Sequence, residues 1–202
     1  MVDEHGFPKG RCHNAGYGVD TSFFQPKAPP PSPFVVSAGS ANRDYQTLVS
    51  AVDGLDVPVR IAADSLWRPK GSDVDIAELP PQVSVASAGD YMQLRNLYAA
   101  ASIVVVPLHP ARFASGYAVI AEAMAMGKVV VTTRTDALSD LIVDGQTGVY
   151  VDAGDVIGLR AALTALLADP ERCRNMGDAG SARIRKEFSL EAYCQRMEEI
   201  IQ

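Results

Sequence analysis

The sequence contains few cysteines, and no two of them stand close together. There are 3 in 202 residues, Cys12, Cys173 and Cys194, and they form no C-x-x-C pair. Three cysteines cannot all be bridged, so we expect free thiols in a reducing compartment, which indicates the cytoplasm. The N-terminus also lacks the apolar core of a signal peptide.

Long hydrophobic runs and an excess of basic charge are absent too. The longest apolar run, 99–108, is too short to span a bilayer, although contact with a membrane surface stays open. The 18 Lys and Arg against 24 Asp and Glu give a formal net charge of −6, which argues against a nucleic-acid partner. The histidines are scattered, so we expect no metal site.

What the sequence does contain is an alternation of strand and helix signals after a proline-rich segment at 26–33. Short apolar runs predict strands at 34–39, 57–63, 83–87, 102–108, 128–133 and 148–152. Helices are expected at 42–55, 90–100, 115–126, 155–168, 170–187 and 189–201. This order predicts an α/β fold, a doubly wound and mostly parallel Rossmann-like sheet with extra C-terminal helices. Ligands of such folds bind beyond the carboxyl ends of the strands.

The loop after the first predicted strand, "AGSANRDY" (38–45), combines Gly39, Ser40 and Arg43. Backbone amides at a helix start and one guanidinium favour a diphosphate site. A plain turn with an exposed arginine explains the same residues, and the loop alone does not decide between the two. It lacks both G-x-G-x-x-G and G-x-x-x-x-G-K-[ST], so it is neither a dinucleotide fingerprint nor a P-loop.

The predicted helix at 115–126 is apolar nearly all round, which indicates deep burial. Ser115 is the expected N-cap, and Gly116 lets a ligand approach the backbone closely. Glu122 carries the only charge of this helix. With a diphosphate at the helix start, its carboxylate would reach the ribose hydroxyls. The alternative is a buried glutamate bonded to backbone or to an arginine.

The segment "SGYAVIAEAMAMGKVVVTTRTDALSDLIVDGQTGVYVDAGD" (115–155) resembles the donor-binding segment of the glycosyltransferase group 1 family. That family has the GT-B fold of two facing Rossmann-like domains. Glu122 matches the second glutamate of its Glu-x7-Glu motif, which holds the nucleotide ribose. "GYGVDTSFFQP" (16–26) is similar to the family's interdomain signature. The resemblance implies a nucleotide-sugar donor bound without metal or other cofactor by Gly39, Ser40, Arg43, Ser115, Gly116, Tyr117, Glu122 and Asp140.

Two positions depart from the family pattern. Ala114 stands where the family has its first glutamate, which contacts the transferred sugar, and Ser40 replaces an arginine. Arg43 is the nearby cation that could take over, with Arg68 and Lys70 as further candidates. The family implies retention at the anomeric carbon, and Ala114 weakens that inference. A non-catalytic or degenerate nucleotide-sugar binding module is therefore the alternative, while the "GVD" and "EAMAMG" runs argue against a GT-B epimerase.

The resemblance also divides the chain. Residues 1–33 match the end of the family's N-terminal acceptor domain and the interdomain linker, and 34–202 match the donor-binding domain. We therefore expect a C-terminal half with little or no activity alone, whose catalytic residues are unknown and whose last helix crosses back to the acceptor domain. Residues 85–87 lie where the family's base rests. Arg134 can be interpreted equally well as a site residue or as a loop charge. For Trp67, packing in the fold is the preferred interpretation over stacking on a base.

Overall fold

The computed structural model describes residues 6, 12–26, 32–63, 79–111 and 113–201. The predictions for Trp67, Arg68 and Lys70 lie outside these residues. The described chain folds around a six-stranded, all-parallel sheet with the strand order β3-β2-β1-β4-β5-β6. The strands are β1 (Val35–Ala38), β2 (Val59–Ala62), β3 (Val83–Val85), β4 (Ile103–Val106), β5 (Val129–Thr133) and β6 (Val149–Val151). The predicted doubly wound fold is confirmed, because the order reverses direction between β1 and β4.

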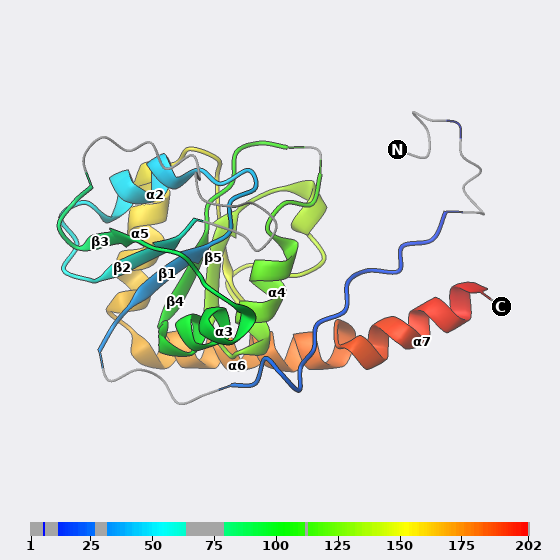
Figure 1. The fold of residues 1–202 in the computed structure, drawn as a ribbon. Helices are drawn as coiled ribbons and strands as arrows, with labels where there is room; N and C mark the ends of the chain where they lie inside the picture. The colour runs from blue at the N-terminus through cyan, green and yellow to red at the C-terminus, as the bar shows by residue number, and fades with distance from the viewer. Residues whose placement is uncertain (1–5, 7–11, 27–31, 64–78, 112, 202) are drawn as a thin grey trace.

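Helices cover both faces of the sheet (Figure 1). One face packs against α2 (Tyr45–Val52) and α5 (Val156–Leu167), and the other against α3 (Tyr91–Ala100) and α4 (Tyr117–Ala125). The long helix α6 (Pro170–Glu187) contacts both α4 and α5. Helix α7 (Leu190–Ile201) continues beyond it and projects from the domain. No helix of the described part of the chain is long and apolar enough to cross a membrane.

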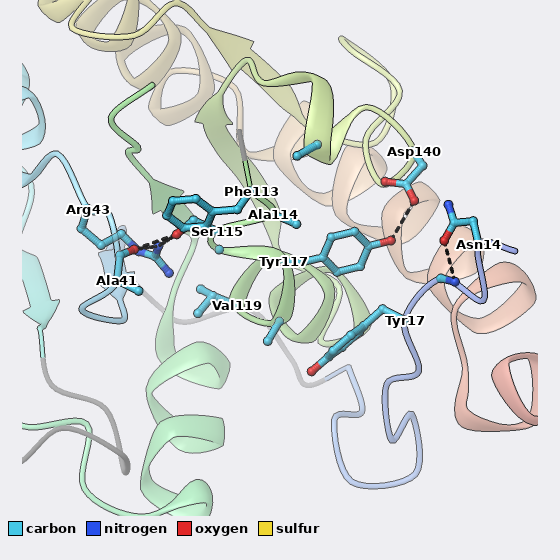
Figure 2. Close-up of a pocket in the computed structure, with 14 residues that line it drawn as sticks. Asn14, Tyr17, Ala41, Arg43, Phe113, Ala114, Ser115, Tyr117, Val119 and Asp140 are labelled. Atoms are coloured by element: carbon cyan, nitrogen blue, oxygen red, sulfur yellow. Dashed lines mark hydrogen bonds between the residues drawn. The ribbon is translucent and has the colours of Figure 1, made fainter. Parts of the chain in front are cut away.

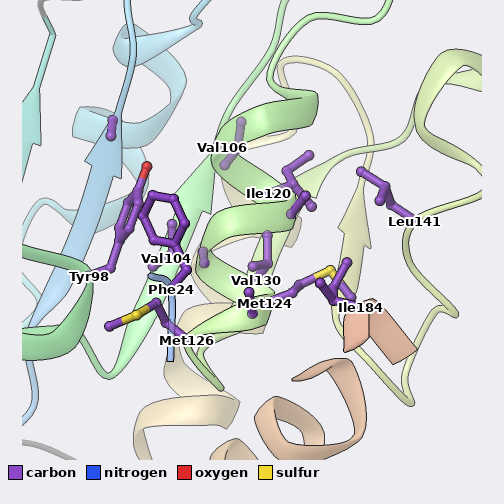
Figure 3. Packing of buried hydrophobic residues seen from close by; sticks show 14 of the residues in the cluster. Phe24, Tyr98, Val104, Val106, Ile120, Met124, Met126, Val130, Leu141 and Ile184 are labelled. Carbon is purple, nitrogen blue, oxygen red and sulfur yellow. The ribbon is translucent and has the colours of Figure 1, made fainter. Parts of the chain in front are cut away.

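The central strands are apolar along their whole length because both faces are covered. Alternate residues of β4 belong to different cores, with Val104 and Val106 facing α4 and Ile103 and Val105 facing α2 and α5. Figure 3 shows the α4 side, where Met124 and other buried side chains fill the space between β4, β5 and α6. This packing fixes the start of α4 at the carboxyl edge of the sheet.

Predicted and observed element ends differ by no more than two residues, as is usual, except at both ends of one helix, which is expected at 42–55 and spans Tyr45–Val52. The helix expected from residue 42 begins at Tyr45. Asn42 has a positive φ of 56°, which an α-helix does not accept. Asp44 caps the helix instead, since its side chain accepts a hydrogen bond from the Thr47 backbone amide at 3.0 Å. The turn before α2 is therefore longer than predicted, and Arg43 lies within it.

The segment 14–24 packs against the junction of α6 and α7. The backbone amide of Val19 donates to Phe188 O at 2.8 Å, and the amide of Leu190 donates to Val19 O at 3.0 Å. Phe24 is 6% exposed and lies in the core beside Tyr98 (Figure 3). The segment thus contributes to the core of this domain, and the division at residues 33 and 34 stays a prediction.

Gly177 gives a direct test of how closely α6 approaches the sheet. A Cβ at Gly177 would lie 2.2 Å from the backbone oxygen of Gly127, which cannot rotate away. We expect Gly177→Ala to lower the free energy of unfolding by about 2 kcal/mol. Urea denaturation measures this, with Ala179→Gly on the exposed side of α6 as the control, expected to cost about 1 kcal/mol through helix propensity. A more stable Gly177→Ala variant would contradict this close contact.

Candidate functional site

Two loops meet at the carboxyl edge of the sheet, one between β1 and α2 and the other between β4 and α4. The amide of Asp44 donates to Pro107 O at 3.0 Å, and the amide of His109 donates to Asn42 O at 3.2 Å. The Asn42 side chain returns a bond to His109 O at 2.8 Å. These bonds across the switch point of the sheet bring Arg43 to the start of α4.

Arg43 is held by oxygens of its own loop and of the α4 loop. Its Nε donates to Ala38 O at 2.9 Å, and its Nη1 donates to Ala41 O at 2.7 Å and to the Ser115 hydroxyl at 3.4 Å. Gly39 makes this possible, because a Cβ there would lie 2.6 Å from Nη2. Burial lowers the pKa of Arg43 from its ordinary value. Its Nη2 makes no hydrogen bond within the described residues, which leaves a donor for a ligand.

The first turn of α4 offers further donors. Gly116, with a φ of 82°, is the N-cap residue, and no side chain caps the helix. The expectation that Ser115 caps α4 is therefore wrong, because its hydroxyl donates to Ala41 O at 2.8 Å instead. The amides of residues 117–119 precede the first helical hydrogen bond and point out of the helix end. Together with the helix dipole they form an electropositive end.

Arg43 and the start of α4 border one open cavity of about 690 Å³ (Figure 2). Its lining residues come from the N-terminal segment, the two loops, α4 and the loop after β5: Asn14, Gly16, Tyr17, Ala41, Arg43, Phe113, Ala114, Ser115, Gly116, Tyr117, Ala118, Val119, Ala137 and Asp140. Five of the predicted site residues, Arg43, Ser115, Gly116, Tyr117 and Asp140, are thus brought together. Gly39, Ser40 and Glu122 do not line the cavity. Gly39 contributes indirectly, because its lack of a side chain leaves room for the Arg43 guanidinium.

Glu122 lies in α4, outside the residues that line the cavity, and is 8% exposed. Its Oε2 accepts a hydrogen bond from the hydroxyl of the fully buried Tyr98 at 3.3 Å. Burial raises the pKa of Glu122 to about 7, and the bond from Tyr98 lowers it only in part. The predicted alternative of a backbone or arginine partner is wrong within the described residues, since a neutral phenol is the bonded group.

Tyr17 lines the cavity and lies within electrostatic reach of Glu122. Burial raises the pKa of Tyr17, and the negative charge of Glu122 raises it further. The Tyr17 ring lies 5.3 Å from the ring of Tyr117, centroid to centroid. Both residues line the cavity, and Figure 2 shows the Tyr17 ring below the Tyr117 ring.

No sequence pattern pointed to Tyr17 or Tyr98 as residues of the site. Tyr17 lies in the segment 16–26 that resembles the interdomain signature, but no local pattern predicts that its ring returns to α4. Tyr98 occupies an ordinary core position of α3, and its bond to Glu122 spans 24 residues. Arg134, which was open between a site role and a loop charge, bonds Asp144 at 2.6 Å and does not line the cavity.

Metal-ligating side chains do not gather in the part of the chain that the structure describes. No group of three or more His, Cys, Asp or Glu side chains is positioned to hold an ion. The charged side chains that line the cavity are Arg43 and Asp140.

The fold and the cleft beyond its strand ends define a Rossmann-like domain with a cavity that is electropositive at the start of α4. Residues 41–169 match the family model described as Glycosyl transferases group 1. The chain belongs to this family.

Relatives and solved structures agree with the assignment. The alpha-maltose-1-phosphate synthase of Mycobacterium tuberculosis is 30% identical over 202 aligned residues, covering 85% of this chain and 51% of that protein. The D-inositol 3-phosphate glycosyltransferase of Segniliparus rotundus is 40% identical over 100 residues, which are 50% of this chain and 21% of that protein. The sucrose-phosphate synthase of Thermosynechococcus elongatus superposes with a TM-score of 0.79 at 25% identity, over 93% of this chain and 51% of that chain. The chain spans about half or less of the length of the curated relatives it matches.

Proposed function

We propose that this chain is the nucleotide-sugar donor-binding domain of a glycosyltransferase. One observation carries the proposal: the uncapped start of α4 and the guanidinium-bearing side chain of Arg43 border the same cavity. Backbone amides, a helix dipole and a guanidinium are the groups that bind a diphosphate. The names of the relatives, which include a D-inositol 3-phosphate glycosyltransferase and an alpha-maltose-1-phosphate synthase, support the same class.

In this proposal the diphosphate lies at the start of α4 and against Arg43. As the bond between the sugar and the diphosphate breaks, negative charge grows on the departing phosphate, and these fixed donors stabilise it. No metal is required for that neutralisation. Glu122 accepts hydrogen bonds from the ribose hydroxyls, which is the role that the resemblance to the family implies for it. The acceptor is bound by residues outside this chain, so the chain alone transfers little or no sugar.

Retention at the anomeric carbon is part of the proposal, because the resemblance to the group 1 family implies it. Following the anomeric proton of a transfer product by NMR, with the complete protein, measures the stereochemistry. An inverted product would remove this part of the proposal and leave donor binding untouched.

A non-catalytic donor-binding module is the second candidate, and Ala114 favours it. Ala114 lines the cavity one residue before Ser115 and brings no carboxylate to it. Turnover by the complete protein and by its Ala114→Glu variant separates the two. If the unaltered protein turns over donor, the enzyme proposal stands. If only Ala114→Glu is active, the chain is a degenerate binding module.

The test of donor binding is thermal unfolding of the chain with UDP, ADP and GDP. We expect at least one of them to bind and the matching nucleoside monophosphate to bind more weakly. At 100 times the dissociation constant, binding adds about 2.7 kcal/mol to the free energy of unfolding. For a domain of this size that is a rise in Tm of about 5–10 °C. The 2′-deoxy form of the same diphosphate is expected to bind less well, since Glu122 loses one hydroxyl. Indifference to all three diphosphates would refute the proposal.

A further inference from the structure

The two ends of the cavity carry opposite charge. Among its described lining residues, Arg43 is the one cation and Asp140 the one carboxylate. They lie on opposite sides of Tyr117 in Figure 2. Ala114, Ala118 and Ala137 complete the wall and offer no charge. If the phosphates of a ligand occupy the Arg43 end, the group attached to those phosphates therefore lies near Asp140.

Asp140 is held firmly on one side and is unbonded on the other. Its Oδ2 accepts a hydrogen bond from the Tyr117 hydroxyl at 3.0 Å, and its backbone oxygen accepts one from Arg183 Nη2 at 2.7 Å. Burial and the charge of Asp140 both raise the pKa of Tyr117, so this phenol stays a neutral donor. Oδ1 has no hydrogen-bond partner in the described part of the chain. The carboxylate is thus a positioned acceptor with one free oxygen.

The nearby arginines do not neutralise this carboxylate by direct contact. Arg183 directs its guanidinium to the backbone oxygens of Asp140 and Leu141 and to the Glu187 side chain. Arg196 donates to the backbone oxygens of Ala15, Tyr17 and Glu187. Both guanidinium groups are therefore already engaged with other oxygens. The negative charge of Asp140 faces the cavity and acts on its ligand.

Tyr117 sets the distance between the phosphate end and Asp140. Its backbone amide belongs to the first turn of α4, and its hydroxyl bonds the carboxylate. Asp140 consequently lies one tyrosine side chain from the proposed diphosphate position, within reach of a sugar on the terminal phosphate. An ionised carboxylate accepts hydrogen bonds from hydroxyl groups and repels another carboxylate.

We propose that Asp140, positioned by Tyr117, binds hydroxyl groups of the donor sugar and selects neutral sugars over sugar acids. This inference rests on the proposed donor-binding function and adds the substrate class to it. Asp140 contacts the sugar directly, whereas Tyr117 acts by fixing the direction of the carboxylate. The selection comes from the negative charge of Asp140, which the carboxylate of a uronic acid would have to approach.

The test is calorimetric titration of the chain with UDP, ADP, GDP and their glucose and glucuronic acid conjugates. For the base that binds, we expect the glucose conjugate to bind wild type at least about 10-fold more tightly than the glucuronic acid conjugate. Asp140→Asn is expected to weaken the glucose conjugate by about 10-fold, since a bond to a charged acceptor becomes a neutral one. The same variant should bind the glucuronic acid conjugate more tightly than wild type does, and its affinity for the free diphosphate should be unchanged.

Two further variants separate this effect from disturbance of the fold. Asp136→Asn alters an exposed carboxylate of the same loop that does not line the cavity, and it should change none of the affinities. Tyr117→Phe keeps the ring and should reduce the preference for glucose over glucuronic acid while free diphosphate still binds. If Asp140→Asn leaves that preference unchanged while diphosphate binds, the inference is wrong and the proposed function stands. If no diphosphate binds wild type, both are overturned.

Discussion

Replacing Arg43 with alanine is expected to weaken nucleoside diphosphate binding by about 100-fold. A hydrogen bond to a charged group contributes about 1.5–3 kcal/mol, and the guanidinium supplies both a bond and a charge to the diphosphate. Calorimetric titration of wild type and Arg43→Ala with the diphosphate that binds measures the loss. Because the guanidinium also bonds Ala38 O and Ala41 O, urea denaturation of the free variant must show that the domain is still folded.

Two companion variants show whether the position or only the charge of Arg43 matters. Arg43→Lys keeps the charge but loses the planar fork, and we expect a loss of about 10-fold. Arg172→Ala removes an exposed arginine of α6 that does not line the cavity, so it should leave the affinity within error of wild type. If Arg172→Ala and Arg43→Ala lost equal affinity for the diphosphate, the effect would come from the net charge of the domain and not from the position of Arg43. Unchanged binding in Arg43→Ala would place the diphosphate elsewhere.

Replacing Glu122 with glutamine is expected to stabilise the empty domain at pH 8 by about 3 kcal/mol. The folded pKa, about 7, lies above the ordinary value of 4.5, so ionising this carboxyl costs more in the folded state. That cost appears as the pH rises from 4.5 to 7 and is complete above it, at about 1.4 kcal/mol per pKa unit. Glutamine removes the cost. Urea denaturation should therefore show a gain near 3 kcal/mol at pH 8 and about 1 kcal/mol at pH 5.

The same substitution is expected to weaken nucleotide binding by about 10-fold at pH 8. An ionised carboxylate accepts ribose hydroxyls more strongly than an amide does. Wild-type affinity should rise with pH through about 7, where Glu122 ionises, and Glu122→Gln should show a flatter profile. The control is Glu171→Gln, which alters an exposed residue of α6 and should change the free energy of unfolding by no more than about 0.5 kcal/mol. A Glu122→Gln variant that is less stable than wild type at pH 8 would contradict the argument.

Opposite signs for stability and affinity would distinguish a binding residue from a packing residue. Tyr98 supplies one hydrogen bond to Glu122, while Oε1 has no partner in the described part of the chain. A buried carboxylate with so little support is more costly than a neutral side chain of the same shape. Such a cost is typical of a residue whose hydrogen-bond partner is the ligand itself. For this reason we expect Glu122→Gln to raise the stability of the empty domain and to lower its affinity for the nucleotide.

Much of the fold was predictable because local signals agree with it. Pro170 begins α6 where a proline needs no amide hydrogen bond, and Gly127 with its φ of 70° ends the turn between α4 and β5. Continuous apolar strands such as β4 belong in a sheet covered on both faces, and their alternation with helices dictates right-handed parallel crossovers. The start of α2 was not predictable, since Asn42 adopts a positive φ only within its bonds to the β4–α4 loop.

The sequence by itself determined the doubly wound sheet, the family resemblance and the position of Glu122 in a buried helix. Only the tertiary structure decided that Arg43 and Ser115, 72 residues apart, share a hydrogen bond, and that Tyr117 and Asp140 form a second pair. It also assigned Ser115 to a loop contact rather than a helix cap. The reason is physical: periodicity and turn chemistry act over a few residues, whereas these contacts depend on how α4 packs between the sheet and α6.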